Sequence, residues 1–231
     1  MTGAAAAVRF DPADRGATQA FIRANTRLIA PPLVPEIVLH LAEESLPIWQ
    51  KTEEELGAIN LPPPYWAFAW AGGQALARYL LDNANLVAQK RVLDLGSGSG
   101  LSAIAAAKAG ASHVLASDID AMALAATALN AEANSQNVAA TSDDLLAALP
   151  PEYDVVLVGD LFYERPLADR VAAFVAAAQG RGALVLIGDP QRNYFPKDAF
   201  EQVAEYAVPV TRELEDAEIK RAAVWRPRFG A

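Results

Sequence analysis

The segment Val92–Gly100 limits the possible folds of this chain more than any other part of the sequence. It reads Val92-Leu93-Asp94-Leu95-Gly96-Ser97-Gly98-Ser99-Gly100 and leads from a short apolar run into an alanine-rich amphipathic one. Glycines permit positive φ and let a backbone approach a ligand closely, and a helix that starts there offers unpaired N–H groups. The segment predicts a strand–loop–helix junction that binds a ligand. A purely structural turn between strand and helix is the alternative.

From Arg91 onward, short apolar runs alternate with longer amphipathic ones, which is typical of βαβ units that build a parallel sheet. The predicted strands are Arg91–Leu95, His113–Ser117, Val138–Thr141, Asp154–Val158 and Ala183–Ile187. The predicted helices are Leu101–Ala109, Ala121–Asn134, Leu167–Ala178 and Lys197–Tyr206. The alternation then stops, and Val208–Leu214 and Lys220–Trp225 flank a short acidic turn. These two runs predict an antiparallel hairpin.

A parallel sheet closed by one hairpin resembles the class I methyltransferases, which have a Rossmann-like α/β fold of seven strands with the last inserted antiparallel. We expect a single domain over 1–231, with a helical extension over 1–64 and the α/β core over 65–231. Within the extension, Ala17–Ile29 and Pro35–Leu56 are predicted helices. The segment Tyr65–Asn83 is aromatic and then helical, with leucines on one face.

The glycine spacing indicates which cofactor the loop holds. Dinucleotide-binding dehydrogenases carry G-x-G-x-x-G, but position 101 is leucine here and the spacing is G-x-G-x-G. The loop also has no phosphate-binding lysine. We therefore predict S-adenosylmethionine as cofactor, with S-adenosylhomocysteine as product. The predicted loop contacts are Gly96, Ser97, Gly98 and Gly100, with Asp94 facing loop amides or the ligand's amino group.

Acidic residues follow the next two strands. Asp118 ends the second strand about twenty residues after the glycines, where a carboxylate can accept both ribose hydroxyls. Asp120 is the competitor, although its position suits a cap of the helix at Ala121. After the third strand, Asp144 is the predicted contact to the adenine edge. The alternative is that either acid, Asp143 or Asp144, is a solvated turn residue.

The fourth strand ends in Gly159-Asp160-Leu161-Phe162-Tyr163, beyond which a methyl acceptor should lie. Asp160–Tyr163 matches the Asp/Glu-x-x-Tyr/Phe signature of a group of lysine methyltransferases, and no proline follows Asp160. A carboxylate can hold an ammonium, and a tyrosine face can pack against it. We predict Asp160 and Tyr163 as catalytic residues and Gly159 as a cofactor contact. A structural turn closed by Asp160 is the alternative.

Composition narrows the class of partner. The formal charge of −9 argues against unaided binding to nucleic acid, and an acidic surface favours a basic partner. There is no cysteine, and the 2 histidines, His40 and His113, leave little for a metal site. No apolar run is long enough for a signal peptide or a membrane span. We expect a cytoplasmic monomer that binds no metal, nucleic acid or membrane.

Over about residues 28–225 the chain also resembles the lysine methyltransferases of the electron transfer flavoprotein beta subunit. The resemblance is carried by Pro31–Ile37, Pro64–Asn83, Leu93–Gly98, Gly159–Tyr163 and Ile187–Pro190. It implies methylation of lysines on a surface loop of that subunit and places Trp70 beside the cofactor, whereas Trp66 is expected to pack in the core. Ribosomal protein L11 methyltransferases resemble the cofactor region as well. A small-molecule N-methyltransferase, a binding module and a nicotinamide-dependent oxidoreductase remain the other hypotheses.

Overall fold

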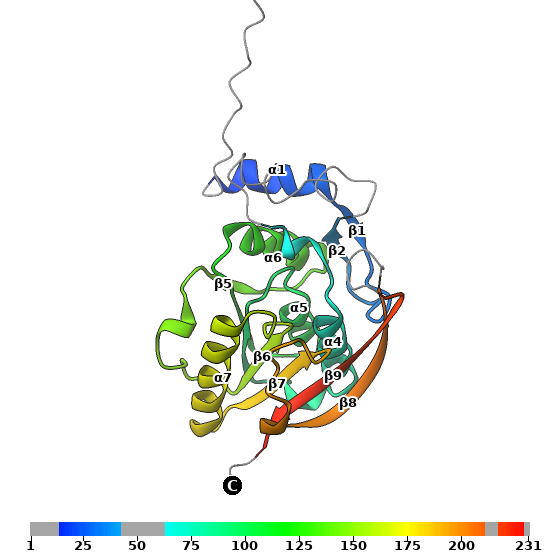
Figure 1. The fold of residues 1–231 in the computed structure, drawn as a ribbon. Helices are drawn as coiled ribbons and strands as arrows, with labels where there is room; N and C mark the ends of the chain where they lie inside the picture. Colours follow the sequence, from blue (N-terminus) through cyan, green and yellow to red (C-terminus); the bar gives the residue numbers. More distant parts are fainter. Residues whose placement is uncertain (1–13, 43–62, 211–216, 229–231) are drawn as a thin grey trace, which may run out of the picture.

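A seven-stranded sheet forms the centre of the molecule in the computed structural model, which describes residues 14–42, 63–210 and 217–228 (Figure 1). Its strands follow the order β5-β4-β3-β6-β7-β9-β8. The strands are β3 (Arg91–Leu95), β4 (His113–Ser117), β5 (Ala139–Thr141), β6 (Val155–Gly159), β7 (Leu184–Asp189), β8 (Phe200–Pro209) and β9 (Ile219–Pro227). The first five are parallel, and β9 lies antiparallel between β7 and β8. The predicted seven-stranded sheet with its last strand inserted antiparallel is confirmed, and the predicted bounds of β3 and β4 match to the residue.

Helices cover both faces of the sheet, which explains why its parallel strands are continuously apolar. The helices are α4 (Ala71–Asp82), α5 (Leu101–Lys108), α6 (Ala121–Ala133) and α7 (Arg165–Gly180). In β6, Val155 and Leu157 belong to the core cluster shared with α4 and α5. Val156 and Val158 point to the other face, into the cluster shared with α7. Short 3₁₀ turns are η1 (Tyr65–Ala67), η2 (Ala84–Leu86), η3 (Leu145–Ala147) and η4 (Lys197–Ala199).

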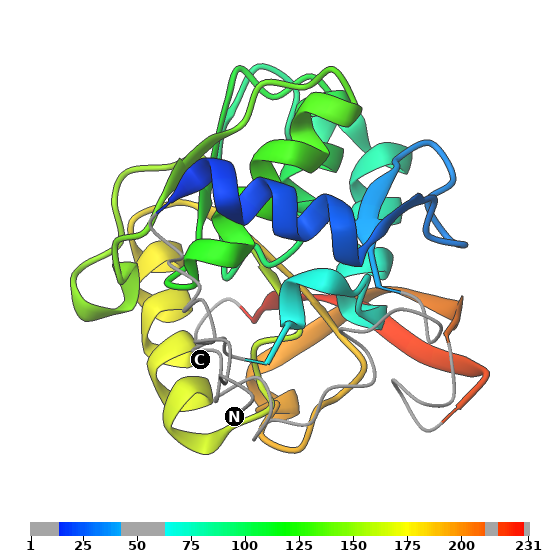
Figure 2. The same ribbon diagram turned by 90° about the horizontal axis from the view of Figure 1, so that it is seen from above.

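The N-terminal extension is less helical than predicted. Helix α1 (Arg15–Asn25) ends four residues before the predicted Ile29 because Arg27–Ile29 forms β1, which pairs antiparallel with β2 (Leu39–Leu41). A helix starting at Pro35 is therefore wrong over residues 35–42, while residues 43–56 lie outside the described part of the chain. Long-range bonds hold β2 instead, since the backbone N–H of His40 donates to Asn130 of α6 at 2.7 Å. Viewed from above, α1 crosses over α6 (Figure 2).

The predicted helix over Lys197–Tyr206 is also wrong, because β8 begins at Phe200 and pairs along its length with β9. A register shift between Gln202 and Ala204 places Val203 as an extra residue in the strand. The bulge breaks the two-residue alternation and leaves the three-residue spacing of Phe200, Val203 and Tyr206, which resembles a helix. The predicted hairpin is confirmed, although its first strand starts earlier and residues 211–216 lie outside the described ranges.

Candidate active site

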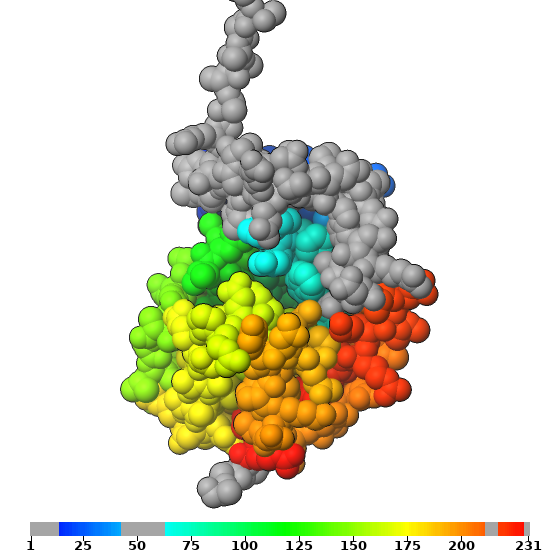
Figure 3. All heavy atoms as spheres, in the orientation of Figure 1, coloured from blue at the N-terminus to red at the C-terminus, as the bar shows by residue number. Residues whose placement is uncertain are grey.

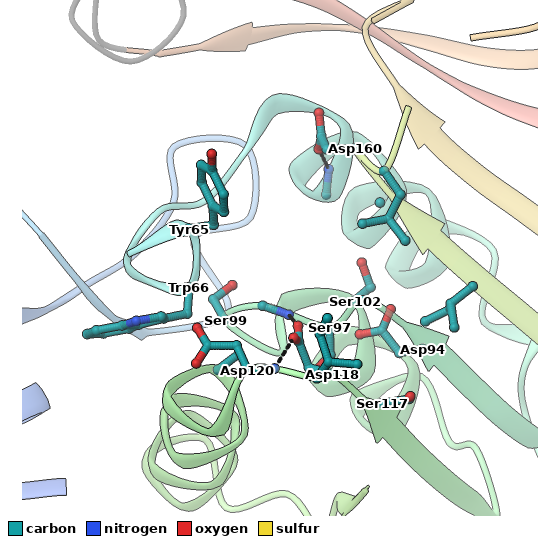
Figure 4. Close-up of a pocket in the computed structure, with 18 of the residues that line it drawn as sticks. Tyr65, Trp66, Asp94, Ser97, Ser99, Ser102, Ser117, Asp118, Asp120 and Asp160 are labelled. Carbon is teal, nitrogen blue, oxygen red and sulfur yellow. Dashed lines mark hydrogen bonds between the residues drawn. The ribbon is translucent and has the colours of Figure 1, made fainter. Parts of the chain in front are cut away.

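A cavity of about 430 Å³ lies at the carboxyl ends of β3, β4 and β6. The chain leaves β3 toward β4 on one side and later forms β6 on its other side, so the strand order reverses at β3. Such a switch point is where open α/β sheets bind ligands. The lining includes the predicted residues Trp70, Asp94, Gly96, Ser97, Gly98, Asp118, Asp144, Gly159, Asp160 and Tyr163. Figure 4 shows Asp94, Asp118 and Asp120 at one end of this cavity and Asp160 at the other.

The glycine loop turns through left-handed backbone at each of its three glycines, Gly96, Gly98 and Gly100. At Gly96, with φ of +65°, a Cβ atom would also lie 2.7 Å from the Leu161 side chain. Gly100 is the N-cap of α5, and a Cβ there would lie 2.9 Å from Thr127 of α6. Gly100 does not line the cavity, unlike the other predicted loop residues. Its place indicates that it lets α5 and α6 pack closely behind the loop.

Asp94 ties the end of β3 to the start of α5. Its Oδ2 accepts a hydrogen bond of 3.0 Å from the backbone N–H of Ala103, the third residue of that helix. The sequence predicts either loop amides or the ligand's amino group as the partner of Asp94, and the donor observed within the protein belongs to α5 and not to the loop. Burial, reinforced by the charge of Asp118, raises the pKa of the Asp94 carboxyl to about 7. The side chain still reaches the cavity wall.

Asp118 and Asp120, which follow β4, make different contacts: Asp118 binds the glycine loop and Asp120 caps α6. Asp118 accepts 2.8 Å and 3.0 Å hydrogen bonds from the backbone N–H groups of Gly98 and Asp120, one at each carboxylate oxygen. Asp120 caps α6 by accepting a 2.9 Å bond from Met122, which confirms the predicted cap. Burial raises the pKa of both carboxyls, that of Asp120 to about 6. Asp118 therefore ties the glycine loop to the end of β4.

Asp144 lines the cavity from the turn after β5. One of its oxygens accepts a 3.2 Å bond from Leu146 and so caps η3, and the other pairs with Arg170 of α7 at 2.6 Å. Its neighbour Asp143 accepts a 2.7 Å bond from the Thr141 hydroxyl. Both readings of Asp144, as an adenine contact and as a turn residue, fit this arrangement.

Asp160 stands where the chain leaves β6, in a left-handed conformation with φ of +56° that is rare for a residue with a side chain. Its Oδ2 accepts a 2.8 Å bond from the backbone N–H of Gly73, near the start of α4. Its Oδ1 accepts 2.7 Å and 3.1 Å bonds from Nη2 and Nε of Arg192. The side chain is 8% exposed. Backbone strain held by such specific partners is typical of functional sites.

Arg192 was missed at the sequence level, although it lies two residues after the Gly188-Asp189-Pro190 motif. Asp189 is fully buried, and its Oδ1 accepts a 2.7 Å bond from the backbone N–H of Arg192. Burial, helped by the charge of Asp160, raises the pKa of Asp189 to about 7. The arginine guanidinium lies 5.3 Å from the centroid of the Trp70 ring. Asp189 thus positions the Arg192 cation, which no local sequence pattern predicts.

Aromatic rings form the rim of the cavity nearest Asp160. The ring of Tyr65 lies 5.8 Å from that of Tyr163 and 6.1 Å from that of Trp70. Figure 3 shows the cyan segment around η1 meeting the yellow-green chain that follows β6. Burial and the charge of Glu164 raise the pKa of the Tyr163 hydroxyl, which is neutral at physiological pH. Trp66 is 2% exposed among residues of α1 and α6, as predicted, while its edge also reaches the cavity.

Two of the five segments that carry the resemblance, Pro64–Asn83 and Ile187–Pro190, meet in space. A Cβ atom on Gly72 of α4 would lie 2.3 Å from the carbonyl oxygen of Gly188, and one on Gly188 would lie 2.1 Å from that of Gly72. Only two glycines allow α4 to start this close to the end of β7. The close approach is what brings the Gly73 amide to Asp160.

Comparison with known proteins identifies the family. The chain is 38% identical over 213 residues to the electron transfer flavoprotein beta subunit lysine methyltransferase of Danio rerio, covering 89% of this chain and 81% of the relative. The Homo sapiens protein of the same name is 38% identical over 214 residues, covering 90% and 80%. This chain belongs to that family. The predicted resemblance is confirmed, and the chain is a lysine methyltransferase whose methyl donor is S-adenosylmethionine.

Further matches agree with this membership. Residues 74–177 of the methyltransferase match the family described as ribosomal protein L11 methyltransferase (PrmA). The Dechloromonas aromatica protein of that name is 36% identical over 145 residues, which cover 62% of this chain but 47% of the relative. The solved magnesium protoporphyrin IX methyltransferase of Synechocystis PCC 6803, with bound S-adenosylmethionine, superposes with a TM-score of 0.51 at 18% identity, covering 68% of this chain and 78% of that one. That likeness confirms the predicted fold class.

Within residues 14–42, 63–210 and 217–228, no helix has the length and apolar character needed to cross a membrane. Within the same ranges, no three histidine, cysteine, aspartate or glutamate side chains are grouped so that they could hold a metal ion.

Proposed function

We propose that this enzyme transfers methyl groups from S-adenosylmethionine to lysine side chains of the electron transfer flavoprotein beta subunit. Relatives named for that activity align with 89% and 90% of the chain. The observation that carries the proposal is Asp160, a buried carboxylate held in strained backbone at the cavity wall beside an aromatic rim. Such a site suits a long aliphatic side chain that ends in nitrogen.

The opposite end of the cavity suits the cofactor. The hydroxyl of Ser97 is buried and has no protein hydrogen-bond partner among the described residues, so it is available to a ligand. We propose that Asp118 receives the ribose hydroxyls, that Asp144 meets the adenine edge and that Asp94 faces the amino group. Gly96, Gly98, Gly159 and Trp70 supply the remaining wall. When bound there, S-adenosylmethionine supplies a methyl group on a positively charged sulfur.

Asp160 and Tyr163 then define the acceptor side. We propose that the carboxylate orients the lysine nitrogen, and that the faces of Tyr163 and Tyr65 pack against the lysine methylenes. Tyr163 is 39% exposed, so the rim is open to a side chain that enters from a protein surface. The formal charge of −9 supports a partner that presents lysines.

The acceptor must lose a proton before it can react. A free lysine titrates near ~10.4, so presenting the neutral amine at pH 7 costs about 4–5 kcal/mol. A bare carboxylate favours the ammonium and would raise this cost, whereas desolvation favours the amine. Asp160 therefore serves first to bind and orient the lysine, and only second as a proton acceptor.

A labelling experiment tests the substrate. Enzyme is incubated with radiolabelled S-adenosylmethionine and either the purified flavoprotein or a cell lysate, with the Asp160→Asn enzyme as control. We expect label on lysines of the beta subunit, lost when those lysines are replaced by arginine. Label on a ribosomal protein alone would favour the other substrate class that the match over residues 74–177 suggests. Label confined to small molecules would refute a protein substrate.

We also propose that the enzyme works as a cytoplasmic monomer and binds neither nucleic acid nor membrane. The acidic net charge supports the part that concerns nucleic acid. Light scattering of the purified enzyme, fractionation of cells and a salt-dependent nucleic-acid binding assay test the three parts separately.

A further inference from the structure

The carboxylate of Asp160, at the acceptor end of the cavity, forms an ion pair with Arg192. The guanidinium of Arg192 donates through Nε and Nη2 to Oδ1 of Asp160, and the amide of Gly73 donates to Oδ2. The arginine and aspartate side chains are 18% and 8% exposed, so water screens the pair only weakly. A lysine that enters the cavity therefore meets an ion pair and not an isolated anion.

Arg192 is itself held in place from two sides. Its backbone N–H donates to Asp189, which is buried at the end of β7, and its guanidinium stacks near the Trp70 ring. Trp70 is the N-cap residue of α4, whose third residue supplies the Gly73 amide. The loop after β7 and the start of α4 thus fix the cation and the carboxylate relative to each other.

We propose that Arg192 is a positioning residue that neutralises Asp160, so that the carboxylate orients the acceptor lysine without holding it as an ammonium. This inference rests on the proposed function. Without the arginine, the carboxylate would favour the protonated lysine, which has no lone pair to react. With the arginine, the lysine releases its proton to water more readily, and the same Asp160 oxygens can still direct the amine.

Other ionisable groups around this point come from several elements. Asp189 lies on β7, Tyr163 follows β6, Tyr65 belongs to η1 and Asp118 ends β4. Tyr163 is neutral in the working pH range, and Asp118 lies at the cofactor end of the cavity (Figure 4). Asp189, whose pKa burial raises to about 7, is the other carboxyl group described beside the pair, and it accepts from the backbone N–H of Arg192. The Arg192 guanidinium is thus the cation that the structure places on Asp160.

The first test is the pH dependence of methylation of the flavoprotein beta subunit. Arg192→Gln should move the acidic limb of kcat/KM to higher pH by about one unit, a tenfold loss at neutral pH that is recovered in alkali. KM for the protein substrate should stay equal or fall, and the affinity for S-adenosylhomocysteine should not change. Arg192→Lys keeps the charge and should retain most of the wild-type profile. Arg221→Gln, on the exposed hairpin, controls for loss of a positive charge.

The second test needs no turnover. In thermal unfolding, Arg192→Gln should lower the Tm because it leaves Asp160 buried without its cation, and adding Asp160→Asn should restore most of the loss. Additive losses in the double variant would overturn the inference. So would an Arg192→Gln enzyme slowed equally at every pH. If the wild-type enzyme leaves the beta subunit unlabelled, the proposed substrate is wrong, and the unfolding cycle still decides whether Arg192 neutralises Asp160.

Discussion

Asp160 joins three parts of the chain through its side chain and its backbone. It accepts from the start of α4 and from Arg192, while its own backbone N–H donates to Gly188 of β7 at 2.9 Å. Asp160 is therefore placed both to contact the acceptor lysine and to hold α4, β7 and the loop after β7 together. A variant must keep its size and hydrogen-bonding capacity if the two roles are to be separated.

Asp160→Asn meets that requirement because the amide oxygen can still accept from Gly73. We expect methylation of the beta subunit to fall by about tenfold to a thousandfold, the range for loss of a positioned electrostatic group. The dissociation constant of the cofactor should change little. Tyr163→Phe should be milder, since only the hydroxyl is lost. A wild-type rate in Asp160→Asn would mean that the carboxylate is only structural, and Glu164 would be tested next.

Asp118 offers a second residue-scale test, at the cofactor end. We expect Asp118→Ala to weaken binding of S-adenosylhomocysteine by about 1.5–3 kcal/mol, the scale of hydrogen bonds to a charged group. Part of the loss comes from the Gly98 and Asp120 amides, which the carboxylate now holds. Calorimetry on this variant and on Asp169→Ala, an exposed control on α7, measures the effect. Unchanged affinity in a folded variant would move the ribose role to Asp120.

At the scale of elements, the contact between α4 and β7 aligns the acceptor end. Gly72 and Gly188 let the first turn of α4 touch the backbone of β7, with no space for a methyl group between them. The segments Trp70–Gln74 and Gly188–Pro190 therefore pack directly against each other. They are one packing unit, separated by over a hundred residues in sequence.

Gly72→Ala should therefore damage both stability and activity. The new methyl group would lie 2.3 Å from the Gly188 carbonyl oxygen and 2.6 Å from Oδ2 of Asp160, so α4 must shift. We expect a loss of about 1–3 kcal/mol in the free energy of unfolding, typical of overpacking, together with slower methylation. Gly180→Ala, at the end of α7 with nothing within 4 Å of the new atom, is the matched control. Urea unfolding should show it to be neutral or stabilising, and equal effects of the two substitutions would contradict this account.

What the sequence predicts well is decided by local pattern. Strands β3 and β4 are short apolar runs bounded by glycine and aspartate, and their bounds match the prediction. The two predicted helices that are wrong lie where the structure depends on partners elsewhere in the chain. Strand β2 is held by Asn130 of α6, and β8 is held by its pairing with β9. Arg192 was missed for the same reason, because its partner lies 32 residues away and no spacing rule links them.

At the scale of the whole molecule, folding gathers several carboxyl groups at one end of the sheet. Burial raises the pKa of Asp94 and Asp189 to about 7 and that of Asp120 to about 6, from 3.8. The folded state therefore binds more protons than the unfolded state between about pH 4 and 7. These groups make the protein less stable as pH rises through that window. His40 acts in the opposite sense, because burial lowers its pKa.

Asp189→Asn isolates one of these contributions. The amide can still accept the Arg192 N–H, but it cannot ionise. We expect the Tm of the variant, relative to wild type, to rise between pH 5 and pH 7.5, because only the wild type must ionise a buried carboxyl over that range. Differential scanning calorimetry at several pH values measures the difference. A constant difference across pH would show that Asp189 does not titrate differently in the folded and unfolded states.

The insertion of β9 between β7 and β8 has a consequence for the order in which a ribosome can complete the enzyme. Each of the strands β4 to β7 pairs with a strand that precedes it in the chain, so the cofactor end can assemble during translation. Strand β8 has no neighbour in the sheet until β9 follows, and Trp225 of β9 donates to the Asp189 carbonyl beneath the acceptor end. A nascent chain should thus form its cofactor pocket first. It should become able to transfer a methyl group only after β9 pairs between β7 and β8.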